Sequence, residues 1–176
     1  MRDLIVRRAT PEDAAALGVL IDGFAKGHPA EHHARSMNRM RDAFFANKPV
    51  GHVLLAEKSG FGAWRETNDV FWSVYGGAGL GLYVAPPHRG LGVALCIIAA
   101  ICAEIRNQGG HFLEASYDPI MASLYERVGV GRIERACHVS AIAFETLAAA
   151  TGMPAREVVG ALPDKAMNHV PVNPGI

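Results

Sequence analysis

The feature that most restricts the fold is a helical segment at residues 91–108 that is apolar almost all the way round. Leu95 and Ile98 lie at helical spacing on one face, while Ile97 and Ile101 make another face apolar as well. A helix of this kind is stable only when it is buried on more than one side. The fold must therefore pack other elements around it.

Alternating and continuous apolar runs predict strands before and after that helix. The predicted strands cover residues 4–9, 50–57, 61–65, 70–75, 79–84, 111–115 and 135–139, and the further predicted helices cover residues 14–24, 31–45, 119–128 and 142–150. A helix start is predicted at Thr10, whose hydroxyl suits the N-cap. Pro11 suits the first helical position, and Asp13 places an acid in the first turn. A turn signal at 67–69 and the glycines at 76–77 interrupt residues 61–84, which the pattern leaves as two strands or three. The order of elements is mixed and predicts an α/β (α+β mixed) fold.

Length and charge indicate one globular domain without a strongly charged partner. The 176 residues predict a single domain at 1–162, followed by a loose tail at 163–176 rich in proline and glycine. Lys+Arg 17 balance Asp+Glu 17, which argues against nucleic acid or an anionic membrane as a partner. No apolar run reaches the roughly 20 residues of a membrane helix. The first residues lack the apolar core of a signal peptide, so we expect a cytoplasmic protein.

The residues that commonly bind metals do not form a recognisable ligand set. The three cysteines have no zinc-type spacing, and two of them fall within the apolar helix. His28, His32 and His33 lie close together in sequence, but no third ligand follows at a suitable distance. We therefore expect no metal.

The stretch that carries chemistry is a strand followed by a glycine-containing turn and then the apolar helix. Gly90 and Gly92 let the backbone approach a ligand closely, and the unpaired amides of a helix N-terminus attract anions. Arg89 adds a cation suited to phosphate. A pyrophosphate would suit such a turn, although a tight turn with close packing explains a glycine pair equally well. No Walker loop is present, and the glycines at 77, 79 and 81 lead into a strand instead of opening a helix, which excludes a dinucleotide fingerprint.

Arg89, Gly92 and Ala94 match the acetyl-CoA-binding pattern (R/Q)-x-x-G-x-(G/A), and on this pattern the chain resembles the GNAT superfamily of N-acetyltransferases. Residues 82–86 look like the fourth strand of that family, and residues 118–130 are similar to its pattern N-x-x-A-x-x-L-Y-x-x-x-G-F. The resemblance covers about residues 4–140 and departs from the pattern at Asp118, Met121 and Val130. It implies a GNAT-like acyl-CoA acyltransferase fold, with a twisted, mostly antiparallel sheet flanked by helices.

The resemblance also implies roles for individual residues. Backbone groups would hold the pyrophosphate and the pantetheine arm of acetyl-CoA, and the cofactor-binding positions are Leu82, Tyr83, Val84, Arg89, Gly90, Leu91, Gly92, Val93, Ala94 and Asp118. Tyr125 falls on the general-acid position, where its hydroxyl would protonate the leaving thiolate. A base must also accept a proton from the amine, and Glu114 is one candidate, directly or through water, with Glu57 and His111 as others. No cysteine is expected to form a covalent intermediate, because neither thiol within the helix has a paired base.

The expected function is transfer of an acetyl group from acetyl-CoA directly to a primary amine of a small molecule or peptide. Two alternatives stay open: a noncatalytic acyl-CoA-binding or regulatory module, and a toxin-like enzyme that acetylates aminoacyl-tRNA. The balanced charge disfavours the second of these. The resemblance also allows a homodimer.

Overall fold

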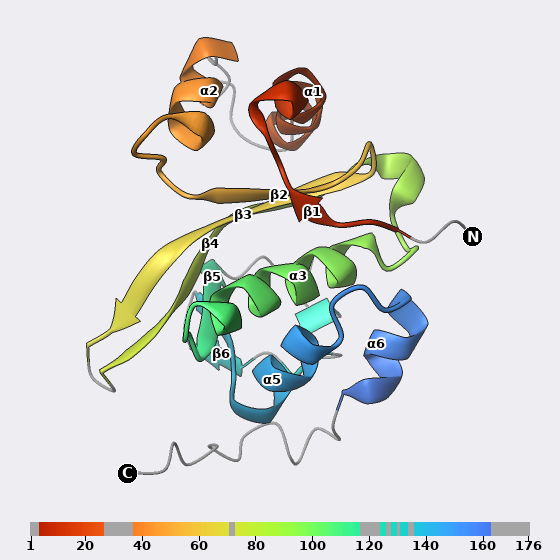
Figure 1. Cartoon of the computed structure of the whole chain (residues 1–176). Helices are drawn as coiled ribbons and strands as arrows, with labels where there is room; N and C mark the ends of the chain where they lie inside the picture. Colours follow the sequence, from red (N-terminus) through yellow and green to blue (C-terminus); the bar gives the residue numbers. More distant parts are fainter. Residues whose placement is uncertain are drawn as a thin grey trace.

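The apolar helix is enclosed between a β-sheet and a second layer of helices, as its sequence predicts (Figure 1). This computed structural model describes residues 4–26, 37–70, 73–116, 124–125, 128–129, 131–133 and 136–162. The helix is α3, Val93–Asn107, and the side chains of Ile97, Cys102 and Ile105 are fully buried. Because the sheet covers one side and helices cover the other, apolar residues are needed on both faces.

In the described part of the chain, seven strands form one sheet in the order β1-β2-β3-β4-β5-β7-β6. The strands are β1 (Arg7–Arg8), β2 (His52–Ala56), β3 (Gly60–Asp69), β4 (Val74–Val84), β5 (Phe112–Ser116), β6 (Gly131–Ile133) and β7 (Ala136–Ser140). Neighbouring strands run antiparallel except β4 and β5, which are parallel. The expected α/β fold with a mostly antiparallel sheet is confirmed.

Helices cover both faces of this sheet. The helices α1 (Ala14–Ala25) and α2 (Met37–Phe45) lie on one face, and α5 (Ala141–Ala149) and α6 (Ala155–Ala161) lie with α3 on the other (Figure 1). Each face has its own apolar core: Leu17 and Phe61 belong to one, and Trp64, Ile97 and Phe144 belong to the other. The sheet is therefore buried on both faces, and α3 packs against one of them.

The structure corrects the prediction for residues 61–84. The turn signal at 67–69 is wrong, because β3 continues to Asp69 and the chain reverses only before β4 begins at Val74. The predicted break at Gly76 and Gly77 is also wrong. A Cβ on Gly76 would lie 2.5 Å from the Phe112 ring, and one on Gly77 would lie 2.3 Å from Ile105. These glycines sit inside a strand because neighbouring side chains fill their Cβ positions. The region therefore makes two strands.

Outside this region, the structure adds one strand and agrees with the predicted helix start. The strand β6 was not predicted, and it is only three residues long. The predicted helix start is confirmed: Thr10 N donates to Asp13 Oδ2 at 2.8 Å, and a short 3-10 turn, Pro11–Asp13, leads into α1. The Arg7 guanidinium donates to both oxygens of Asp13, which holds the pKa of that carboxyl well below its usual range. The predicted tail at 163–176 lies outside the described residues.

A polar cluster ties α3 to the far edge of the sheet. Glu104 accepts a hydrogen bond from Trp64 Nε1 at 3.1 Å, and its two oxygens also accept bonds from Arg8 at 3.1 and 3.0 Å. Trp64 is fully buried, and Glu104 is the acceptor for its indole N–H. Loss of the Glu104 carboxylate would therefore remove this acceptor.

We expect Glu104→Ala to lower the free energy of unfolding by about 2 kcal/mol, because it leaves a buried donor unpaired. Glu104→Gln keeps one acceptor oxygen and should cost about 1 kcal/mol. The matched control is Glu145→Ala, whose carboxylate lies 4.0 Å from Arg106 on the surface, and it should cost less than about 0.5 kcal/mol. Urea unfolding at neutral pH measures all three, and equal losses for Glu104→Ala and Glu145→Ala would refute the importance of the cluster.

Candidate active site

The sheet opens between its two parallel strands. The strands β4 and β5 pair only at Gly77 with Leu113 and at Ala78 with Glu114. Beyond Ala78, the part of β4 that ends at Val84 keeps its pairing with β3 on the other edge. Among the described residues, no strand pairs with the β5-facing edge of that part. The unpaired edge can bind an extended molecule as an added strand would.

A bulge in β4 lies at this fork. Trp64 pairs with Gly79 while Ala63 pairs with Gly81, so Leu80 is an extra residue in β4. A bulge bends the strand that carries it and increases its local twist. Gly79 contributes as well, because a Cβ there would lie 3.1 Å from the Ala115 Cβ. The bulge and the close approach at Gly79 together allow the two strands to meet and then separate.

The glycine-containing turn follows β4 directly. A short 3-10 turn at Pro86–His88 leads from β4, and Gly90 and Gly92 then have φ of 75° and 80°. Both angles fall in the left-handed region that glycine adopts without strain. Helix α3 begins at Val93, so its first amides have no partner within the helix. The Arg89 amide is already used, since it donates to the Pro86 carbonyl at 3.3 Å. The other amides at the start of α3 can bind an anion such as a diphosphate.

The Arg89 side chain lies against the end of β4. Its Nε donates to the Val84 carbonyl at 3.1 Å, and its guanidinium carbon lies 5.9 Å from the centre of the Tyr83 ring. Tyr83 in turn contacts the rings of Phe24 and Phe61. These contacts hold the last residues of β4 in a defined position beside the turn.

The C-terminal end of α1 packs against Tyr83, near the end of β4. A Cβ on Gly23 would lie 2.4 Å from the Tyr83 hydroxyl, so only glycine allows this approach. The backbone positions implied for cofactor binding at Leu82, Tyr83 and Val84 thus form the end of β4, where Tyr83 contacts α1 and the turn follows. The predicted cofactor segments 82–84 and 89–94 are brought together.

The three candidate bases occupy different places. Glu114 is half-buried and lies at the fork, beside Ala78 of β4. Glu57 is exposed in the turn between β2 and β3. His111 is exposed and precedes β5, at the end of the strand opposite to the opening. Of the three, Glu114 is the residue that the fold positions at the fork.

The residues implied by the second family pattern are described only in part. Leu124 and Tyr125 are helical and half-buried, and Val128 N donates to the Leu124 carbonyl at 3.0 Å. Gly129 has φ of 69°, which confirms it as the end of this turn. Asp118 lies outside the described residues, as do His28, His32 and His33. Tyr125 remains a prediction for the general acid.

The two helical thiols are not activated. Burial raises the pKa of Cys96, and burial raises that of Cys102 further. Both thiols are therefore protonated at neutral pH, whereas nucleophilic cysteines need a lowered pKa.

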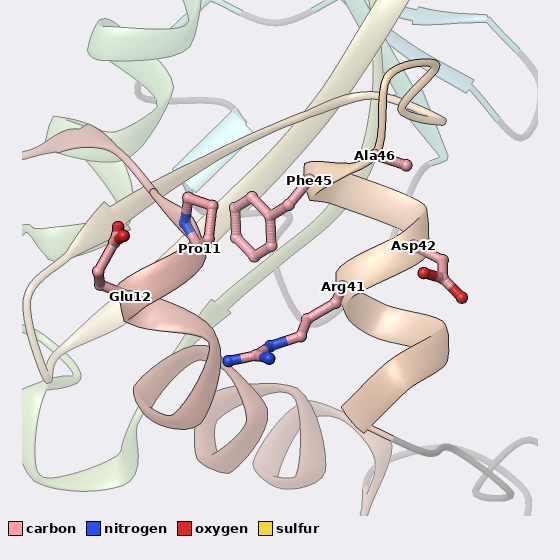
Figure 2. A pocket seen from close by; sticks show the side chains of 6 residues that line it. All are labelled: Pro11, Glu12, Arg41, Asp42, Phe45 and Ala46. Carbon is pink, nitrogen blue, oxygen red and sulfur yellow. The ribbon is translucent and has the colours of Figure 1, made fainter.

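A hollow between α1 and α2 lies at a different place. Pro11, Glu12, Arg41 and Phe45 line it, and Figure 2 shows the Phe45 ring facing Pro11. It adjoins the N-terminal end of α1, whereas Tyr83 contacts the C-terminal end of that helix. The hollow is therefore separate from the fork.

The described ranges contain neither a metal-ligand cluster nor a membrane-spanning helix. No three side chains of His, Cys, Asp or Glu come together there in a way that could hold a metal ion. The described helices also include none with the length and apolarity needed to cross a membrane.

One element near the turn was missed by the sequence analysis. A Cβ built on Gly92 would lie 2.0 Å from the Ala155 Cβ, so α6 packs directly on the glycine turn. The pair is 63 positions apart in sequence, and no local signal marks such a contact.

The acetyltransferase (GNAT) family profile matches residues 18–130. The chain therefore belongs to this family, whose members are acyltransferases, and the resemblance seen in the sequence is confirmed. No curated protein matches the sequence.

Solved structures share this fold at low sequence identity. A GNAT-family acetyltransferase from Staphylococcus aureus Mu50 has a TM-score of 0.58 at 11% identity and covers 76% of this chain and 96% of its own. A ribosomal-protein-alanine N-acetyltransferase from Brucella melitensis has a TM-score of 0.54 at 20% identity, covering 78% and 99%. An aminoglycoside acetyltransferase from an uncultured soil metagenomic sample has a TM-score of 0.57 at 14% identity, covering 69% and 82%. These likenesses concern the fold.

Proposed function

We propose that this protein transfers the acetyl group of acetyl-CoA to a primary amine of a small molecule or peptide. The observation that carries the proposal is the glycine turn at residues 89–94, which follows the part of β4 whose β5-facing edge is unpaired, at a fork between parallel strands. A diphosphate suits the turn, and the extended pantetheine arm suits the strand edge. Acetyl-CoA supplies an activated thioester to this site.

The chain's own residues would bind, orient and exchange protons. Backbone groups of Leu82 and Val84 hold the arm, and Arg89 keeps Val84 in place through its carbonyl. Glu114 at the fork accepts a proton from the amine, directly or through water, because an amine is mostly protonated at neutral pH. Tyr125 donates a proton to the leaving sulfur.

Binding and turnover should be measured separately. Titration calorimetry with acetyl-CoA tests the turn, and a thiol-release screen with polyamines, amino acids, aminoglycosides and peptides tests the transfer. Two of the three neighbours have an acceptor in their names, an aminoglycoside and a ribosomal-protein alanine, and both acceptors belong in this screen. We expect heat on binding and thiol release with at least one amine class. Binding without release from any amine would favour a noncatalytic acyl-CoA-binding module, and no heat at millimolar acetyl-CoA would refute both functions.

A further inference from the structure

The C-terminal helix α6 forms one side of the glycine turn. Ala155 is its first residue and lies against Gly92. Two residues earlier, the Met153 carbonyl lies 3.8 Å from the Cys96 sulfur, one turn into α3. These two contacts join the start of α6 to the start of α3.

The same helix is anchored in the core. Val158 is fully buried and belongs to the apolar cluster around α3, and Leu162 packs against that cluster. Core packing therefore holds helix α6 in place beside the turn. It also lies beyond residues 18–130, so it is an element of this chain outside the matched family region.

Helix α6 has an arginine that is exposed to solvent. Arg156 follows Ala155 directly, and its side chain is 87% exposed. Its one ion-pair contact among the described residues is a distant one, 4.0 Å to the carboxylate of its neighbour Glu157. The other arginine at the turn, Arg89, directs its Nε to the Val84 carbonyl and lies over Tyr83.

Exposed apolar side chains flank the same contact. Leu91 is 52% exposed and Met153 is 42% exposed, and each lies within two residues of the contact between Gly92 and Ala155. The nucleotide end of coenzyme A combines a flat purine with phosphates. An exposed arginine and two exposed apolar residues, all within two residues of the contact between Gly92 and Ala155, match that combination.

We propose that α6 binds the nucleotide end of coenzyme A, with Arg156 pairing with one of its phosphates. This inference rests on the proposed function, because it takes acetyl-CoA as the ligand of the turn. It assigns a role to the C-terminal segment, for which the sequence offered no motif. The phosphate is either the 3′-phosphate or the diphosphate, and truncated ligands distinguish the two.

The test compares variants by titration calorimetry with acetyl-CoA and with its analogue that lacks the 3′-phosphate. We expect Arg156→Gln to weaken acetyl-CoA binding roughly tenfold, since charge-assisted bonds to phosphate are strong but partly screened at an exposed site. Arg156→Lys should retain part of the affinity, because lysine keeps the charge without the planar guanidinium. The matched control is Arg106→Gln at the opposite end of α3, which should bind as the wild type does. Thermal unfolding of each variant checks that the fold is kept.

The outcomes separate cleanly. A loss for acetyl-CoA but not for the analogue identifies the 3′-phosphate, and equal losses identify the diphosphate. Wild-type affinity of Arg156→Gln for both ligands overturns this inference and leaves the proposed function intact. If the wild-type protein itself binds neither ligand, the proposed function fails as well.

Discussion

We expect the Tyr125→Phe protein to bind acetyl-CoA with wild-type affinity and to turn over at least about a hundredfold more slowly, because it lacks the hydroxyl that protonates the leaving sulfur. Phenylalanine keeps the ring, so packing around the half-buried side chain is conserved. Calorimetry gives the affinity, and thiol release with the best amine gives kcat.

Tyr75→Phe is the matched control for this change. The Tyr75 hydroxyl donates to Gln108 at 2.8 Å, and Tyr75 lies near the start of β4, away from the opening. Its loss should leave kcat unchanged. A Tyr125→Phe protein with unchanged kcat would show that another group protonates the sulfur.

The second large effect is expected at Gly92. Replacing it with alanine should lower the free energy of unfolding by about 3 kcal/mol, since the new Cβ meets both an unfavourable φ and the Ala155 Cβ. Acetyl-CoA binding should weaken too, because the turn must move to relieve the contact. Urea unfolding and calorimetry measure the two effects.

Substitution of Gly90 separates the effect of the unfavourable φ from the effect of the contact with Ala155. It has φ of 75°, but a Cβ there would meet nothing within 4 Å. Gly90→Ala should therefore cost only the conformational part, about 1 kcal/mol. In a background of Ala155→Gly, the cost of Gly92→Ala should fall toward that of Gly90→Ala. If the cost stays the same in that background, packing against α6 is not the cause.

Local patterns account for much of what could be predicted. The apolar residues around α3 required burial on two sides, and α5 and the sheet supply it. The turn with Gly90 and Gly92 was recognisable because positive φ favours glycine and the adjoining helix follows within a residue. Both features depend on residues that lie close together in sequence.

The parts that escaped prediction depend on distant contacts. Gly76 and Gly77 resemble a strand break until Phe112 and Ile105 are seen to fill their Cβ positions. The packing of α6 on Gly92 joins residues that no periodicity connects. Likewise, sequence spacing could not rank the candidate bases, whereas strand pairing places Glu114 at the fork.

The contact between Arg89 and Val84 gives a physical reason for the first position of the acetyl-CoA pattern. The bond from Nε ends on a main-chain oxygen, so what it requires is an N–H donor on a long side chain. Glutamine carries such a donor in its carboxamide without any charge. In this chain, the first position of the pattern therefore anchors a strand end, and that contact requires an N–H donor and no net charge.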